Sequence, residues 1–141
     1  PTLRNLHLAI GVAAMLAFIF TGQYMHWVLD HLRELPDGPR LFHRTTHIYL
    51  MRAAALNIAL GCFLVQPGKP SHRVIQRVSS IAVLLGPLLL LASFFLESFR
   101  PDLERPMARY ANFLAFGGVT GHLVAWFLSR ANVREDVRES V

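Results

Sequence analysis

The segment from Val78 to Leu96, VSSIAVLLGPLLLLASFFL, contains no charged residue over its 19 positions. A helix rises about 1.5 Å per residue, so a segment of this length can cross the roughly 30 Å hydrocarbon core of a bilayer. Three further segments are similar: residues 5–29 and 110–129 carry no charge, and residues 45–66 carry only Arg52. These four segments predict an all-α integral membrane protein, built as a four-helix transmembrane bundle.

The overall composition excludes an ordinary water-soluble enzyme. Of the 141 residues, 53% are apolar and 16% are charged, whereas soluble domains average about 25% charged residues. The net charge is +5, but the arginines flank apolar segments, where they are placed to contact lipid headgroups rather than nucleic acid. Cys62 is the only cysteine, which excludes an internal disulfide and a CxxC metal site.

Proline and glycine separate the predicted helices. The sequence PDGP at residues 36–39 lies in a predicted connection of residues 31–44, either extended throughout or with a short helix on the membrane surface, and PGKP at residues 67–70 predicts a tight turn. We expect the second helix to begin at Thr45 or Thr46. Four crossings place both termini on the same side of the membrane. Residues 1–130 are predicted to form the transmembrane domain, and residues 131–141, where Arg alternates with Glu and Asp, a charged C-terminal tail that is either solvated or a helical extension at the membrane surface.

Seven histidines in a chain with one lysine are a chemical anomaly, because ionisable groups inside a membrane are rare and usually face a bundle interior or a cofactor. At about 1.5 Å per residue, His7 and His26 are roughly 28 Å apart along the first helix. Since consecutive helices run antiparallel, we expect two layers. His26 and His47 would meet near one membrane face, and His7, His72 and His122 near the other.

The residues around these imidazoles favour haem over other metal sites. No cysteine lies near them and no carboxylate lies within the segments, so neither a closed zinc site nor a di-iron carboxylate cluster fits. Paired neutral imidazoles suit a haem iron that takes one axial histidine from each of two helices. We therefore predict haem b, one or two per chain. The predicted iron ligands are His7, His26, His47 and His122, with His72 as a further candidate. His31 and His43 are predicted to be solvated loop residues.

Small residues and arginines accompany the histidines. Viewed down the axis of the first helix, Gly11 and Gly22 point in directions between those of His7 and His26. They would leave room for a flat macrocycle. Small residues also let helices pack closely without a cofactor between them, and GGVTG at residues 117–121 contains a GxxxG association motif. Arg44 and Arg52 are placed to receive haem propionates through charge-assisted hydrogen bonds. Contact with lipid phosphate is the alternative for each arginine.

The sequence at the beginning of the first predicted helix resembles that of known membrane protein families. The sequence LHLAIG at residues 6–11, followed by an apolar run to FTG at residues 20–22, resembles the LHxxxG...TG opening helix of PepSY-type transmembrane reductases and cytochrome b561-like proteins. It covers about twenty residues. The resemblance implies that His7 is an axial ligand and that the protein is a small membrane b-type cytochrome.

Two classes of function follow from these patterns. The first is a transmembrane b-type cytochrome with bis-histidine haem, which carries electrons across or within the membrane from a quinol, superoxide or a partner redox protein. Whether it is itself an oxidoreductase stays open. The second is a haem-free structural or assembly subunit of a larger complex, whose small-residue faces form the bundle or a homo-oligomer. For both we expect a lipid bilayer, with the bacterial inner membrane as the location, and no nucleic acid.

Overall fold

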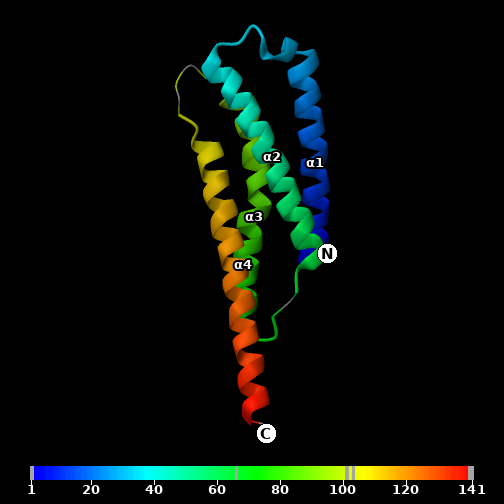
Figure 1. Ribbon diagram of the computed structural model, residues 1–141, viewed down its shortest axis with the longest axis vertical. Helices are drawn as coiled ribbons and strands as arrows, with labels where there is room; N and C mark the ends of the chain where they lie inside the picture. Colours follow the sequence, from blue (N-terminus) through cyan, green and yellow to red (C-terminus); the bar gives the residue numbers. More distant parts are fainter. Residues whose placement is uncertain (1, 66, 101, 103, 140–141) are drawn as a thin grey trace.

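The computed structural model describes residues 2–65, 67–100, 102 and 104–139, and the side chains of these residues up to Arg130. Over this part of the chain the structure contains helices and no strand. The helices are α1 (Leu3–Trp27), the short 3-10 helix η1 (Asp30–Leu32), α2 (Asp37–Phe63), α3 (Pro70–Leu96) and α4 (Pro106–Glu139). Consecutive α helices run antiparallel, so α1 begins and α4 ends at one end of the bundle (Figure 1). The predicted all-α, four-helix fold is confirmed.

We call the end of the bundle where α1 and α3 begin the terminal end, and the end where α2 and α4 begin the distal end (Figure 1). Among the described residues, three helical segments are long and apolar enough to cross a membrane: Leu3–Trp27, Pro70–Leu96 and Pro106–Arg130. The helix α2 is more polar, since Arg52 and Asn57 lie within it, but it packs along both α1 and α3. The chain therefore has the helices of an integral membrane protein.

The start of α2 differs from the sequence prediction. The helix begins at Asp37 rather than at Thr45, so much of the predicted connection of residues 31–44 is helical. The first backbone N–H groups of a helix have no intrahelical acceptor, so Pro39, which lacks an N–H, is tolerated in the first turn. The carboxylate of Asp37 also complements the positive end of the helix dipole.

A left-handed turn joins α1 to α2. Asp30, His31 and Leu32 have φ angles of 41°, 58° and 63°, a conformation that costs residues with a side chain about 1–2 kcal/mol each. Leu32 is buried, and the guanidinium of Arg40 donates hydrogen bonds to three carbonyl oxygens of the turn. Burial and these hydrogen bonds offset the backbone strain.

The helix α4 continues past Arg130 to Glu139. The backbone of residues 131–139, predicted to form a charged tail, is therefore a helical extension of α4. The helix α3 contains a proline, Pro87, and continues through it as a single helix. Residues 140 and 141 lie outside the described residues.

Glycines bring α1 and α2 into close contact. A Cβ atom at Gly11 would lie 2.8 Å from the backbone nitrogen of Ile58. A Cβ atom at Gly61 would lie 2.8 Å from the backbone nitrogen of Leu8. The space beside Gly11, which the sequence analysis assigned to a macrocycle, is therefore filled by α2 in the structure.

Alanine substitutions at two adjacent glycines of α4 are expected to have different effects on stability. A Cβ atom at Gly118 would lie 2.8 Å from the carbonyl oxygen of Ser79 on α3, so Gly118→Ala is expected to lower the free energy of unfolding by about 1–3 kcal/mol. Nothing lies within 4 Å of a Cβ atom at Gly117, so Gly117→Ala should be neutral or stabilise the helix by up to about 1 kcal/mol. Unfolding in mixed micelles, followed by circular dichroism, measures both variants. Equal stability of the two variants would contradict the α3–α4 contact.

Candidate functional site

Histidines from the first and last α helices meet toward the terminal end of the bundle. His7 of α1 is fully buried, and its ring centroid lies 6.1 Å from that of His122 on α4, with 67° between the ring planes. The sequence analysis placed these two residues in one layer from their depth alone. The structure brings their rings together.

Asn57 of α2 contacts the His7 ring. Its Oδ1 lies 2.8 Å from Nδ1 of His7, inside the bundle. Its Nδ2 donates hydrogen bonds to the carbonyl oxygens of Ala53, at 2.9 Å, and Val83, at 3.3 Å. The second ring nitrogen of His7, Nε2, is buried and has no hydrogen-bond partner among the described residues.

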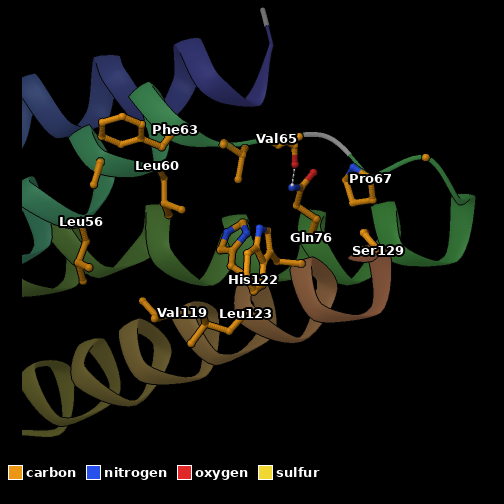
Figure 2. Close-up of a pocket in the computed structure, with 14 residues that line it drawn as sticks. Leu56, Leu60, Phe63, Val65, Pro67, Gln76, Val119, His122, Leu123 and Ser129 are labelled. Atoms are coloured by element: carbon orange, nitrogen blue, oxygen red, sulfur yellow. Dashed lines mark hydrogen bonds between the residues drawn. The ribbon is translucent and has the colours of Figure 1, made fainter. Parts of the chain in front are cut away.

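His122 lines an apolar cavity of about 620 Å³. Leu56 and Leu60 of α2 line one side of it and Val119 of α4 another, and the His122 ring lies on the side toward Gln76 (Figure 2). Nε2 of His122 lies 3.3 Å from Oγ of Ser80 on α3. Apolar walls with a few polar groups, at this volume, are typical of small-molecule and cofactor sites.

Polar groups lie where the cavity approaches the loop between α2 and α3 (Figure 2). Nε2 of Gln76 donates a hydrogen bond of 2.7 Å to the carbonyl oxygen of Val65. Oγ of Ser129 donates to the carbonyl oxygen of Ala125 and lies 3.4 Å from Nδ1 of His72. His72 therefore lies beside the cavity and contacts it through a residue of the cavity wall.

Nearer the distal end, His47 packs against α1. Its ring stacks on Phe18 with a centroid separation of 4.1 Å. The hydroxyl of Thr21 donates to the carbonyl oxygen of Phe18, so Oγ1 of Thr21 accepts the hydrogen bond of 2.9 Å from Nδ1 of His47. A Cβ atom at Gly22 would lie 3.1 Å from Cε1 of His47. Gly22 therefore makes room for the imidazole of His47.

His26 has partners other than His47. It is exposed near the end of α1, and its ring packs edge-on against His31, at 4.0 Å between centroids, and Trp27, at 4.7 Å. His31 lies in the left-handed turn with its Nδ1 3.5 Å from the carboxylate of Asp30. His26 and His47, which the sequence predicts as a pair across one iron, therefore have separate neighbours in the structure.

The prediction that His43 is a solvated loop residue is wrong. His43 is fully buried in α2, where its Nδ1 donates a hydrogen bond of 2.9 Å to the carbonyl oxygen of Pro39. Its ring packs edge-on against Phe94 and Phe99. The reason is the early start of α2 at Asp37, which places this position on a helix face inside the bundle.

A buried carboxylate at the distal end is absent from the residues predicted from the sequence. Glu97, which is 2% exposed, follows the last residue of α3 and accepts hydrogen bonds from the backbone N–H groups of Met107, at 2.7 Å, and Ala108, at 3.2 Å. Oγ of Ser93 donates a third hydrogen bond to it. A carboxylate at this position satisfies N–H groups that have no intrahelical acceptor and complements the positive end of the α4 dipole. The signal in the sequence was a single acidic residue at the end of the third apolar segment.

Arg105 completes this distal cluster. Its guanidinium lies 3.3 Å from the ring centroid of Phe42 and donates hydrogen bonds to the hydroxyl groups of Thr46 and Ser98. Burial lowers the pKa of Arg105 to about 10, and the carboxylate of Glu97 opposes that shift. Arg105 therefore remains charged at neutral pH and links α2 to the ends of α3 and α4.

The two arginines predicted to receive propionates lie in different surroundings. Arg52 reaches from α2 to α4, where it donates a hydrogen bond to Oδ1 of Asn112 and lies 5.5 Å from the ring centroid of Phe116. Its Nε is buried and has no partner among the described residues. Arg44 is exposed. Only Arg52 therefore lies within the bundle.

Protein side chains alone do not complete a metal site in the part of the chain that the structure describes. That part contains no group of three or more His, Cys, Asp or Glu side chains that could hold a metal ion. The pair formed by His7 and His122 would therefore need further ligands from another molecule to fill the coordination sphere of a six-coordinate metal.

No protein-family model, curated protein or solved structure matches this chain.

Proposed function

We propose that the protein is a membrane b-type cytochrome that holds a haem iron between His7 and His122 and transfers electrons through it. The spacing of the two rings is the observation that carries this proposal. Bonds from a metal to an imidazole nitrogen are roughly 2.0–2.1 Å long, so imidazoles on opposite sides of one metal have centroids about 6 Å apart. The observed separation is 6.1 Å, and the angle between the two ring planes leaves this distance unchanged.

The chemistry of the surrounding residues fits haem. The buried Nε2 of His7 has no hydrogen-bond partner among the described residues, which suits a metal ligand. The cavity beside His122, at about 620 Å³, lies within the range of cofactor sites. A porphyrin supplies four nitrogen ligands, so two histidines suffice for a six-coordinate iron. The hydrogen bond between Oγ of Ser80 and Nε2 of His122 is long, at 3.3 Å, and a metal bond to Nε2 would readily replace it.

Iron with two axial histidines has no vacant position, so such a haem carries electrons rather than activating oxygen at the metal. We propose a quinol, superoxide or a partner redox protein as the electron donor, and the bacterial inner membrane as the location. The resemblance of residues 6–22 to the opening helix of cytochrome b561-like and PepSY-type proteins supports this class.

The geometry favours one haem per chain rather than two. A second iron between His26 and His47 would require His26 to leave its contacts with His31 and Trp27 and turn into the bundle. The ring contact of His47 is with Phe18, at 4.1 Å between centroids, and not with a second histidine of the described residues. We therefore assign the single haem to the pair at the terminal end.

A haem-free structural or assembly subunit is the second candidate. It is favoured by the glycines of the α1–α2 contact, because the spaces beside Gly11 and Gly61 are filled by the neighbouring helix. In that case the hydrogen bond between His7 and Asn57 would serve to hold α1 against α2. The cavity would then accommodate a lipid chain.

Visible absorption separates the two candidates. Protein purified in mild detergent from cells that make haem is expected to show a strong Soret band that sharpens and shifts when dithionite is added. A pyridine haemochrome assay should then give one haem per chain. A colourless preparation without bound iron would favour the structural subunit. Two haems per chain would contradict the assignment of a single site and would return His47 to the candidate ligands.

A further inference from the structure

We infer that Asn57 is a positioning residue, which holds His7 in the tautomer that carries its proton on Nδ1 and presents the lone pair of Nε2 toward a ligand. The role in haem binding rests on the proposed function. The tautomer itself follows from hydrogen bonds within the protein and needs no haem.

The orientation of the Asn57 amide is set by two carbonyl groups. Its Nδ2 faces the carbonyl oxygens of Ala53 and Val83, at 2.9 Å and 3.3 Å. Carbonyl oxygens only accept hydrogen bonds, so the amide nitrogen must be the atom that faces them. The amide oxygen is then the atom that lies 2.8 Å from Nδ1 of His7.

The orientation of the amide determines where the His7 proton is. Because the oxygen of Asn57 has no hydrogen to donate, Nδ1 of His7 must carry the proton and donate it. A neutral imidazole has one protonated nitrogen, so Nε2 keeps its lone pair. That nitrogen is buried without a partner among the described residues, and the ring centroid of His122 lies 6.1 Å from that of His7.

The position of Asn57 makes this arrangement rigid. Asn57 is fully buried on α2, and its three hydrogen bonds reach α1, its own helix and α3. An outer-shell hydrogen bond of this kind orients a metal-binding histidine and raises its basicity, and its removal typically costs 10–100-fold in metal affinity or activity. Asn57 would thus set both the direction of the His7 ring and the electron density that it gives to iron.

Nuclear magnetic resonance of the full-length protein, labelled with ¹⁵N-histidine and purified without haem, tests the tautomer directly. In the wild type, His7 is expected to show a protonated, pyrrole-type Nδ1 and an unprotonated, pyridine-type Nε2. The signals of His7 are assigned by their loss in His7→Ala. A His7 ring protonated on Nε2 instead would overturn the inference, whatever the behaviour of any Asn57 variant.

Three variants test the cause. Asn57→Leu should release His7 into a mixture of tautomers, whereas Asn57→Asp keeps an oxygen acceptor and should retain the Nδ1 proton. Thr21→Val is the matched control, because Thr21 accepts the Nδ1 proton of His47 in the same way. It should change the signals of His47 and leave those of His7 unchanged. An unchanged His7 tautomer in a folded Asn57→Leu protein would remove Asn57 as its cause.

Redox titration of the haem-loaded protein tests the consequence. Removing the hydrogen bond makes His7 a weaker donor to iron, so Asn57→Leu should raise the midpoint potential and lower haem affinity by roughly 10–100-fold. A coloured protein whose potential and affinity are unchanged in Asn57→Leu would reject the positioning role but keep the cytochrome proposal. A colourless wild type with the expected His7 tautomer would reject the cytochrome and keep only the tautomer.

Discussion

Replacing either His7 or His122 with alanine is expected to remove most of the bound haem. Each variant deletes one of the two proposed iron ligands, and loss of a ligand should cost at least the 10–100-fold in affinity that outer-shell changes typically cost. The ratio of Soret absorbance to protein concentration after purification measures this loss. Any haem that remains should be five-coordinate, and electron paramagnetic resonance of the ferric form should change from a low-spin to a high-spin signal.

The control for this experiment lies on the same helix. His26→Ala removes an imidazole from α1 that is exposed and packs against His31 and Trp27. We expect full haem content in His26→Ala. If His26→Ala loses haem while His7→Ala keeps it, the iron lies in the distal layer and the assignment to the terminal end is wrong.

Glu97→Ala is expected to destabilise the protein by about 2–5 kcal/mol, because each buried backbone N–H group left without its acceptor costs about 1–3 kcal/mol. The substitution leaves the N–H groups of Met107 and Ala108 without their acceptor at the start of α4. It also removes the negative charge that faces Arg105. Unfolding in mixed micelles, followed by circular dichroism, gives the change in the free energy of unfolding.

Two further variants show how much of this effect comes from the Glu97 charge and how much from the loss of any acidic residue near the start of α4. Glu97→Gln keeps one oxygen acceptor for α4 but no charge, so it should destabilise the protein by about 1–3 kcal/mol, less than alanine does. Glu104→Ala removes an exposed acidic residue close to the start of the same helix, and should stay within about 0.5 kcal/mol of the wild type. If Glu97→Ala is no more harmful than Glu104→Ala, the carboxylate does not hold the two helices together.

The helices and the pairing of His7 with His122 could be predicted from the sequence. Apolar segments of about twenty residues identify membrane-spanning helices by length and hydropathy. Depth along a helix follows from its rise per residue and from the antiparallel order of neighbours. The start of α2 is harder to predict from the sequence, because PDGP at residues 36–39 is typical of a loop and is also compatible with a first helical turn.

The distal cluster could not be predicted from the sequence. Glu97 and Arg105 lie at the edges of apolar segments, where charged residues normally face headgroups. Their burial depends on the end of α3 lying beside the start of α4, with Phe42 of α2 beneath the guanidinium. The same holds for His43, which is polar in the sequence and buried by its position on α2.

The sequence alone determined that the chain has the helices of an integral membrane protein, that it forms four of them, and that His7 and His122 lie at similar depth. These properties depend on local hydropathy and on the constant rise of a helix. Only the tertiary structure decided which faces meet, because the rotation of each helix depends on contacts between distant residues. Ile58 against Gly11 and Asn57 against His7 turn α1 and α2 toward each other, and this rotation leaves His26 exposed and His7 facing His122.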